Sequence, residues 1–277
     1  MGKKVNQNLR STLYNLFRLS EKYLRYYFTA SNGKGHGIHS PFVFDFITKV
    51  LNDKKRYPAY DVVERLRQRL LNDTTVLAVN DFGAGSSIDK TSQRSISSIA
   101  KNAAKPRKYG QLLYRMVRYY QPKSVLELGT SLGITTAYIS LAQPGAAVTT
   151  MEGATALGAV ALKNFNDLRL DRVKIVEGNF DTILAPFIRQ QPMIDFAFID
   201  GNHRMQPTIN YFEMILPKAD QYSIVVFDDI HWSAEMEQAW LHIKNHASVK
   251  CSIDLFFVGI IFFRDDFKEQ QHFAIRF

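Results

Sequence analysis

The sequence predicts an α/β fold in which a mainly parallel sheet is covered by helices on both faces. From residue 123 onward, short apolar runs rich in β-branched or aromatic residues alternate with stretches of helical periodicity. The first of these runs leads directly into a glycine loop at residues 129–133. The last two long apolar runs are not separated by a helix, which is typical of an antiparallel hairpin that completes a sheet.

The first third of the chain is expected to be mostly helical. Apolar residues recur at helical spacing from residue 10 to residue 28, with basic residues between them, which predicts an amphipathic helix. Ser95 is a candidate N-cap. Further helices are predicted at residues 42–51, 60–71, 95–104 and 109–120.

The remainder is expected to form a seven-stranded, mainly parallel sheet. Continuous apolar strands are typical of a sheet whose two faces are both buried. The predicted strands are residues 124–128, 147–151, 173–176, 194–199 and 223–227, followed by apolar segments at 249–257, 259–263 and 273–277. The helices expected between them include residues 135–142, 154–168 and 207–216.

Charge divides the chain into two parts. Residues 1–72 hold 14 Lys and Arg against 5 Asp and Glu, so this segment carries the whole net charge of +9. We therefore expect a basic, helical N-terminal extension or lid at residues 1–108 and a ligand-binding domain at residues 109–277. A basic extension indicates an anionic partner, such as nucleic acid, or a solvated face that keeps the protein soluble.

The sequence also predicts a cytoplasmic protein. Its single cysteine, Cys251, cannot form an internal disulfide, which is typical of a reducing compartment. The N-terminus lacks the apolar core of a signal peptide. The longest strongly apolar run, residues 255–263, is shorter than the roughly 20 residues of a membrane-spanning helix.

The glycine loop fits two functions. Gly129-Thr130-Ser131-Leu132-Gly133 matches the G-x-S-x-G elbow of serine hydrolases. It also fits a nucleotide-binding loop, which needs a strand before it, a helix after it and an acidic residue at the end of the next strand. Glu152 follows the next strand, 23 residues after Gly129, so this loop meets all three requirements.

The competing interpretations are weaker. A second glycine segment, VNDFGAGSS at residues 79–87, lacks a following strand and acidic residue, and we interpret it as a turn or lid. A hydrolase normally builds several strands before its elbow, although Asp200 or Asp228 followed by His231 or His272 would supply the later triad members. A nicotinamide-dependent dehydrogenase is disfavoured because the third glycine of the G-x-G-x-x-G fingerprint is missing.

Five motifs in order carry a family resemblance: LELGTSLGITT, VTTMEG, RVKIVEGNF, IDFAFIDGNH and VVFDDIHWS. Together they resemble the class I S-adenosylmethionine-dependent methyltransferases, and within them the catechol O-methyltransferase-like group of small-molecule enzymes with an Asp-Gly-x-His motif. The resemblance covers residues 109–263 and implies a Rossmann-like sheet. It does not explain the N-terminal third, including HGIHSPF and DFGAGSS.

The resemblance implies a site for S-adenosylmethionine. Glu152 would accept hydrogen bonds from both ribose hydroxyls, and Asp200 would lie beside the cofactor. Phe180 would pack on the adenine or belong to the core. The residues implied to pass under the methionine part are Glu127, Gly129, Thr130, Ser131 and Gly133, and those implied to border the adenine are Gly178, Asn179 and Phe180.

It also implies a divalent metal. In the metal-dependent O-methyltransferases, the positions of Asp200, Asp228 and Asp229 hold a magnesium-type ion with two aspartates and an asparagine. Asp229 departs from that pattern and adds negative charge. Oxygen ligands suit a hard cation, which would lower the pKa of an acceptor hydroxyl. Without a metal, Asp200 would contact the cofactor or cap a helix.

His203 stands where related metal-dependent enzymes have a lysine and is the candidate general base, with His231 as the second candidate. Trp232 is expected to wall the acceptor pocket. The predicted activity is methylation of a small-molecule hydroxyl, assisted by Asp200 and Asp228, with nitrogen left open as the acceptor atom. The alternatives are an RNA (tRNA) methyltransferase that uses the basic extension and a non-catalytic module that binds the cofactor or a partner. A homodimer is also left open.

Overall fold

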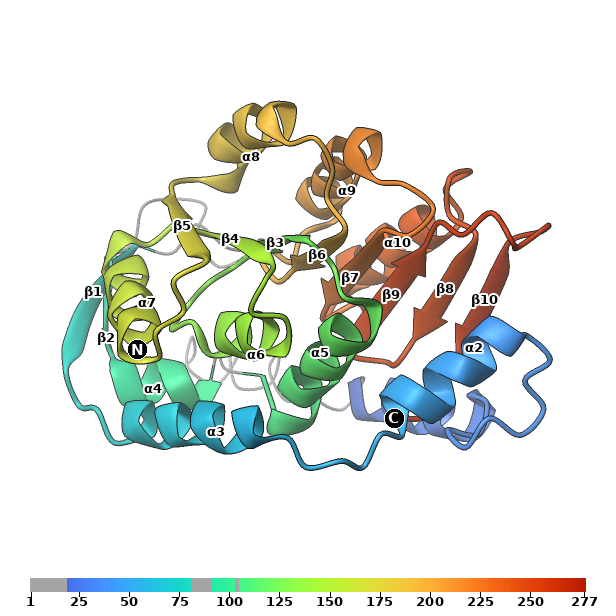
Figure 1. Cartoon of the computed structure of the whole chain (residues 1–277), viewed down its shortest axis with the longest axis horizontal. Coiled ribbons are helices and arrows are strands. Elements are labelled where there is room, and N and C mark those ends of the chain that lie inside the picture. The colour runs from blue at the N-terminus through green and yellow to red at the C-terminus, as the bar shows by residue number, and fades with distance from the viewer. Residues whose placement is uncertain (1–18, 81–90, 103–104) are drawn as a thin grey trace, which may run out of the picture.

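The computed structural model describes residues 19–80, 91–102 and 105–277, and its arrangement is shown in Figure 1. The predicted α/β class is confirmed: a central, mainly parallel sheet lies between two layers of helices. In the described part of the chain, no helix is both long enough and apolar enough to cross a membrane.

The central sheet has eight strands within the described residues, in the order β10-β8-β9-β7-β6-β3-β4-β5. Strands β3 to β7 run parallel, and β9 runs antiparallel to both β7 and β8, which confirms the predicted C-terminal hairpin. The strands are β3 (Ser124–Leu128), β4 (Ala147–Glu152), β5 (Val173–Glu177), β6 (Phe196–Ile199), β7 (Ile224–Asp228), β8 (Cys251–Asp254), β9 (Val258–Phe262) and β10 (Gln271–Ala274).

The prediction of seven strands was wrong by one. Strand β10 pairs parallel with the outer edge of β8, with Gln271 opposite Cys251. Ile275, the residue that follows β10, forms a β-bridge with Ser31. The N-terminal segment therefore pairs with the chain at this edge of the sheet. The apolar pattern at residues 273–277 indicates a strand, but which edge it joins depends on tertiary packing.

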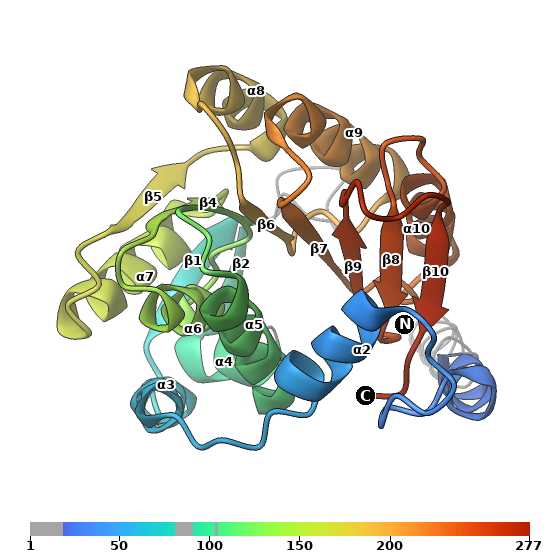
Figure 2. The ribbon, with the colours of Figure 1, turned by 45° about the vertical axis from the view of Figure 1, so that its right-hand side comes forward.

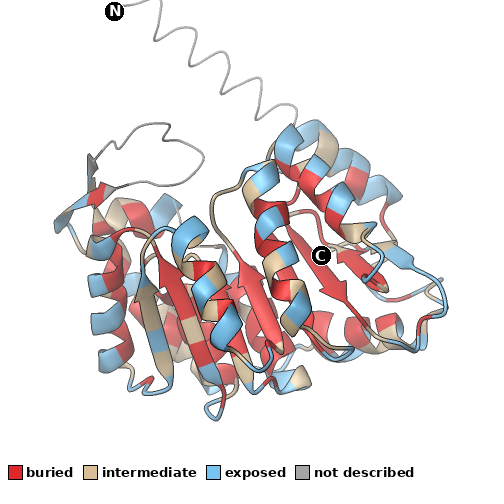
Figure 3. Cartoon of the chain, turned by 90° about the horizontal axis from the view of Figure 1, so that it is seen from above, coloured by how far each residue is buried: buried red, intermediate tan, exposed pale blue. Residues whose placement is uncertain are grey.

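Each face of the sheet has its own core. In β3, Val125 belongs to the core on one face, whereas Leu126 and Leu128 belong to the core on the other, as expected for side chains that alternate along a strand. Helices α5, α6 and α7 pack in the first core, and α8, α9 and α10 pack in the second (Figure 2). Their bounds are α5 (Arg107–Tyr120), α6 (Ile134–Ala142), α7 (Thr155–Asp167), α8 (Phe180–Gln190), α9 (Met205–Ile215) and α10 (Ala234–Lys244). The central strands between these layers are largely buried, whereas the edge strands β5 and β10 are more exposed (Figure 3).

The N-terminal third forms an outer layer beside the first core. Residues 19–29 are helical, and the helix predicted at 42–51 is present as α2 (Pro41–Phe46) followed by a π-helical turn, η1 (Ile47–Leu51). The other predicted helices are α3 (Pro58–Leu71) and α4 (Ile96–Asn102), and Ser95 Oγ accepts a hydrogen bond from Ser98 N at 3.2 Å, as expected of an N-cap. The edge of the Phe42 ring packs on Phe262 of β9, with ring centroids 4.9 Å apart.

An antiparallel hairpin, β1 (Val76–Asn80) with β2 (Thr91–Ser95), was not predicted. The sequence of β2, TSQRS, lacks the apolar alternation that reveals a strand. The DFGAGSS segment, interpreted from the sequence as a turn or lid, falls at residues 81–87 and lies outside the described residues.

The turn after β3 requires glycine because of its packing. Gly129 has φ of +106°, and a Cβ at this position would lie 2.0 Å from the carbonyl oxygen of Asp200. Gly133 has φ of +79°, and its Cβ would lie 2.5 Å from the ring of Phe165 in α7. Close contacts within the protein therefore require glycine at both positions, apart from any ligand.

Replacement of Gly129 by alanine is expected to destabilise the fold. The left-handed conformation alone costs an L-residue about 1–3 kcal/mol, and the overlap with Asp200 adds to this. Urea denaturation measures the effect. The control is Gly145→Ala, because a Cβ at Gly145 meets nothing within 4 Å. Equal unfolding midpoints for the two variants would contradict this account of the turn.

Candidate active site

A cavity of about 600 Å³ opens at the carboxyl ends of the parallel strands. It is lined by residues that directly follow β3, β4, β6 and β7, which is where ligands bind in open α/β sheets. The predicted site residues that line it are Gly129, Ser131, Glu152, Asn179, Phe180, Asp200, His203, Asp228, Asp229 and Trp232.

The Glu152 carboxylate is held in place by the glycine loop. Its Oε2 accepts a hydrogen bond from Ser131 N at 2.7 Å, and its Oε1 accepts one from Ala154 N at 2.9 Å. The residue is only 9% exposed, yet it lines the cavity. A carboxylate fixed in this way at the wall of a cavity suits a ligand that offers paired hydroxyl donors.

Glu127 lies beneath the loop and does not line the cavity. Its Oε2 accepts hydrogen bonds from the hydroxyls of Thr136 and Thr150, and Oε1 is buried with no partner among the described residues. Burial raises the pKa of Glu127 to about 7, against the effect of the two threonines and with a further contribution from Glu152. An unpartnered buried carboxylate oxygen indicates a missing hydrogen-bond donor at this point.

Three other predicted cofactor residues also stand outside the lining. Thr130 shares a hydrogen bond with Thr150, 2.6 Å between the hydroxyl oxygens, and so belongs to the same network as Glu127. Gly133 is the N-cap residue of α6. Gly178 has φ of +139° and precedes the cavity residues Asn179 and Phe180. We expect these three residues to shape the loops that contact a ligand.

An aromatic wall is formed by residues of α8 and α9. The edge of the Phe180 ring faces Tyr211, with centroids 6.1 Å apart, and both residues line the cavity. The Tyr211 hydroxyl donates to Asp181 at 2.7 Å and accepts from Asn202 at 2.9 Å. Asn179 caps α8 by accepting a hydrogen bond from Asp181 N. The cavity that Glu152 lines therefore also has aromatic side chains in its wall.

The carboxylates of Asp200 and Asp228 meet because their strands are in register. Ile199 of β6 lies opposite Phe227 of β7, so the residues that follow reach the sheet edge together. The Asp228 side chain is fully buried, and Asp200 is 19% exposed. Burial raises the pKa of both carboxyls, and their mutual repulsion raises that of Asp228 further.

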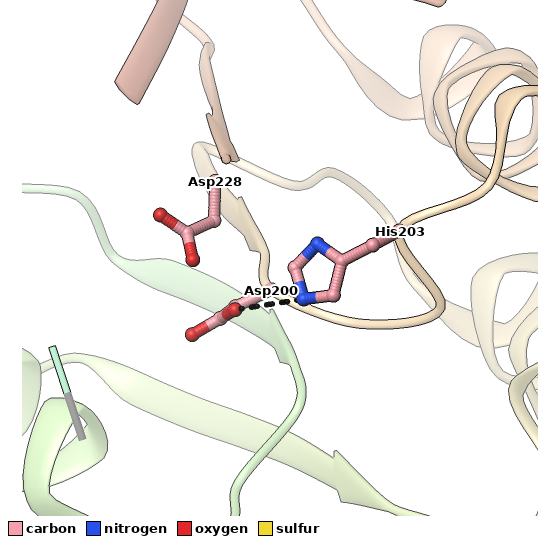
Figure 4. Close-up of side chains that lie close together, drawn as sticks. All are labelled: Asp200, His203 and Asp228. Carbon is pink, nitrogen blue, oxygen red and sulfur yellow. Dashed lines mark ion pairs between the residues drawn. The ribbon is translucent and has the colours of Figure 1, made fainter. Parts of the chain in front are cut away.

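His203 completes this group. Its Nε2 lies 3.6 Å from Oδ1 of Asp200 (Figure 4). Oxygen and nitrogen atoms of Asp200, His203 and Asp228 lie within 4.8 Å of one another, a spacing that suits a metal ion. The loop that carries His203 is constrained, since Asn202 and His203 have φ of 68° and 36°.

Asp229, the third predicted metal ligand, faces a different partner. Its Oδ1 lies 2.8 Å from Nζ of Lys105, a residue of the N-terminal extension that also contacts Oδ2 of Asp228. The Lys105 side chain is 14% exposed. Burial lowers the pKa of Lys105, but the carboxylates of Asp228, Asp200 and Asp229 outweigh burial and hold the pKa above its ordinary value.

His231, the second candidate base, does not line the cavity. Its Nε2 lies 2.8 Å from Asp254, and its Nδ1 lies 3.2 Å from Glu237. Lys22 of the N-terminal helix also contacts Glu237, at 2.7 Å. His231 therefore ties the loop after β7 to the last strands and to the N-terminal helix.

Sequence reasoning missed the lining residues supplied by the N-terminal extension. These are Val79, Arg94, Asn102, Lys105 and Pro106. Lys105 sits in a run, KPRK, in which three cations look equivalent, and only tertiary structure distinguishes the one that enters the cavity. Tyr109, Tyr211 and Phe257 also line the cavity and were not predicted to do so.

The comparisons with known proteins agree with this architecture. Residues 126–230 match the model of a family described as a methyltransferase domain. A comparison with curated proteins finds no match to the sequence.

Solved structures resemble the fold over most of the chain. A methyltransferase from Podospora anserina, PaMTH1, bound to S-adenosylhomocysteine, has a TM-score of 0.57 and 15% identity over 82% of this chain and 97% of its own. The O-methyltransferase TomG of Streptomyces achromogenes, in complex with S-adenosylmethionine, has a TM-score of 0.54 and 14% identity over 79% and 95%. An O-methyltransferase of Bacillus cereus, in complex with S-adenosylhomocysteine, has a TM-score of 0.51 and 17% identity over 80% and 97%.

The resemblance to the class I methyltransferases is thus confirmed. Residues 126–230 match the methyltransferase domain model, and the chain has the fold of solved methyltransferases. The serine hydrolase and dehydrogenase alternatives are not supported. Ser131 uses its backbone N–H to hold Glu152, and His272 contacts Ser252 instead.

The bridge made by His231 predicts a pH-dependent stability. Burial lowers the pKa of His231, but Asp254 and Glu237 raise it by more, so the folded-state pKa lies above the ordinary value. The stabilisation is therefore complete below the unfolded-state pKa of about 6.5 and is lost as pH rises through the folded-state pKa. Urea denaturation between mildly acidic and alkaline pH measures this loss.

The matched variants are His231→Gln and His242→Gln, the latter at an exposed residue of α10. His231→Gln should lose part of the difference in stability between acidic and alkaline pH, and His242→Gln should keep it. An unchanged pH profile in His231→Gln would contradict the bridging role.

Proposed function

We propose that this methyltransferase transfers the methyl group of S-adenosylmethionine to a hydroxyl oxygen of a small molecule. The observation that carries the proposal is the pairing of two features in one cavity. One is the Glu152 carboxylate, which the backbone N–H of Ser131 holds in a position suited to a sugar. The other is the polar group formed by Asp200, His203 and Asp228 at the ends of β6 and β7. The match to a methyltransferase domain supports the methyl-transfer part of this proposal.

The residues present fit the methyl donor. The Glu152 carboxylate would accept hydrogen bonds from the two ribose hydroxyls, and the ring of Phe180 would pack against the adenine. The turn at Gly129 and Ser131 would lie under the methionine part, above the buried Oε1 of Glu127, which has no hydrogen-bond partner among the described residues. The bound donor supplies a methyl group on a positively charged sulfur, which is already electrophilic. The tasks left to the protein are alignment, exclusion of water and removal of a proton.

His203 is the proposed general base. The acceptor oxygen forms a bond to the methyl carbon as the carbon–sulfur bond breaks, and the electron pair of that bond returns to sulfur. The hydroxyl proton passes to the His203 imidazole, whose positive charge Asp200 then stabilises from 3.6 Å. Asp200 therefore acts through His203, and it also borders the donor.

The size of the cavity favours a small acceptor. Its volume of about 600 Å³ has to hold both the donor and the reacting part of the acceptor. Small-molecule sites typically measure about 300–1,000 Å³. Trp232, which is 59% exposed, would cover the acceptor at the mouth of the cavity. Methylation of RNA and assembly into a homodimer stay predictions from the sequence.

Replacement of Glu152 by glutamine is expected to weaken donor binding. Loss of hydrogen bonds to a charged acceptor costs about 1.5–3 kcal/mol each, so the dissociation constant should rise about tenfold or more. Titration calorimetry with S-adenosylhomocysteine measures it. Glu177→Gln is the control, since Glu177 ends the neighbouring strand opposite Glu152 but is exposed and outside the cavity lining. Equal affinities for the two variants would contradict the proposed sugar site.

Replacement of His203 by asparagine is expected to slow transfer and to spare donor binding. Loss of a general base typically lowers turnover about 100-fold or more. Release of S-adenosylhomocysteine is to be measured with a panel of small phenols, catechols and aliphatic alcohols, and with tRNA as the competing acceptor. The exposed His242→Asn serves as the control. Turnover on tRNA alone, or an unchanged rate in His203→Asn, would overturn this assignment.

A further inference from the structure

A lysine ammonium occupies the acidic group in which a divalent ion would be expected. Nζ of Lys105 contacts Oδ2 of Asp228 and lies 2.8 Å from Oδ1 of Asp229. Asp228 and Asp229 are two of the three carboxylates that the family resemblance assigns to a metal. Lys105 also lines the cavity, so its ammonium is in reach of a bound molecule.

We propose that the Lys105 ammonium takes the place of a catalytic divalent ion, so that this protein transfers methyl groups without a metal. The inference rests on the proposed function and deepens it, because it names the group that positions the acceptor oxygen. An ammonium has three hydrogens to donate. Nζ donates one to Oδ1 of Asp229 at 2.8 Å and also contacts Oδ2 of Asp228, and we infer that a hydrogen remains for the oxygen of an acceptor in the cavity.

A metal and this lysine do not fit the group together. An ion bound between Asp200 and Asp228 would share the Asp228 carboxylate with Lys105 Nζ, which already contacts it. A divalent ion and the Lys105 ammonium bound to the same carboxylate in a largely buried site would repel each other strongly. Coordination by Asp228 would therefore require Lys105 to leave.

The surrounding elements hold the lysine in position. Lys105 precedes Pro106, the N-cap residue of α5, and this helix is anchored in the first core by Leu112 and Met116, neither of which is exposed. On the opposite side, Asp229 has φ of 53° and donates its backbone N–H to the carbonyl oxygen of Phe257 at 2.7 Å. The cation and its carboxylate partners thus belong to fixed elements on either side of the cavity.

The lysine also explains a departure from the family pattern. Metal-dependent relatives have an asparagine where this chain has Asp229, and the extra negative charge finds its partner in Lys105. The lysine is supplied by the N-terminal extension, outside the part of the chain that matches the methyltransferase domain. One function of the extension is therefore to complete the catalytic group.

Binding of Mn²⁺ tests the inference without any turnover measurement. Electron paramagnetic resonance is to be recorded while Mn²⁺ is titrated into the full-length protein to millimolar concentration, with and without S-adenosylhomocysteine. The expected result for the unmodified protein is no bound Mn²⁺ in either case. One equivalent of bound Mn²⁺ that is lost in Asp228→Asn would overturn the proposal.

Substitution of the lysine adds a second test. Lys105→Met empties the acidic group of its cation and is expected to gain one Mn²⁺ site, whereas Lys101→Met, at an exposed residue of α4, should gain none. Lys105→Arg retains the charge and should exclude Mn²⁺ as the unmodified protein does. If Lys105→Met does not fold, the unmodified protein and Lys105→Arg still decide the question. A folded Lys105→Met that binds no Mn²⁺ would contradict the proposal.

Activity on any accepted hydroxyl compound provides the final readout. Turnover should survive treatment with EDTA and should fall about 100-fold in Lys105→Met, as on removal of a donor that stabilises a developing oxyanion. Loss of turnover with EDTA would overturn the inference. Calorimetry with S-adenosylhomocysteine separates this failure from failure of the proposed function, which would appear as absence of donor binding in the unmodified protein.

Discussion

The register of strands β3, β6 and β7 determines what the candidate site can do. Leu128 lies opposite Ile199, and Ile199 lies opposite Phe227. The three strands therefore end side by side at the same edge of the sheet. This alignment places the turn at Gly129 against the backbone of Asp200 and leaves no room for a side chain between them. The loop under the proposed donor and the acidic group beside the proposed acceptor are thus two sides of a single contact.

The second constraint is electrostatic. Three neighbouring carboxylates that are largely buried would each be costly, because burial and mutual repulsion both disfavour the charged form. Lys105 offsets part of this cost, since its ammonium contacts two of the three. Loss of one partner from a buried ion pair typically costs about 3–5 kcal/mol. The N-terminal third is therefore coupled to the segment that matches the methyltransferase domain by charge as well as by a shared apolar core.

These two constraints give the extension a role in the site. Residues of β1, β2 and α4 line the same cavity as the strand ends, and Lys22 and His231 connect the N-terminal helix to the loop after β7. An acceptor would therefore meet surfaces from both parts of the chain. The residues at the strand ends would bind the donor and the reacting atoms. Acceptor selectivity is therefore expected to depend on the extension.

The sequence predicted the features that depend on local pattern. The apolar runs before Gly129 and Glu152 identify two strands. Once these strands are placed, the position of Glu152 at the end of the second one is also known. The pairing of the eighth strand and the role of Lys105 were not predicted, because each depends on a distant segment: β10 pairs along β8, and Lys105 is selected from a run of similar cations by the carboxylates it meets. The hairpin of β1 and β2 was missed because the TSQRS segment has no apolar alternation.

A crystal structure of the complex with S-adenosylhomocysteine would test the account most directly. The account predicts the ribose hydroxyls on the Glu152 carboxylate and the ammonium of Lys105 still between Asp228 and Asp229. A sugar bound elsewhere in the cavity, or a divalent ion in the place of the ammonium, would contradict it.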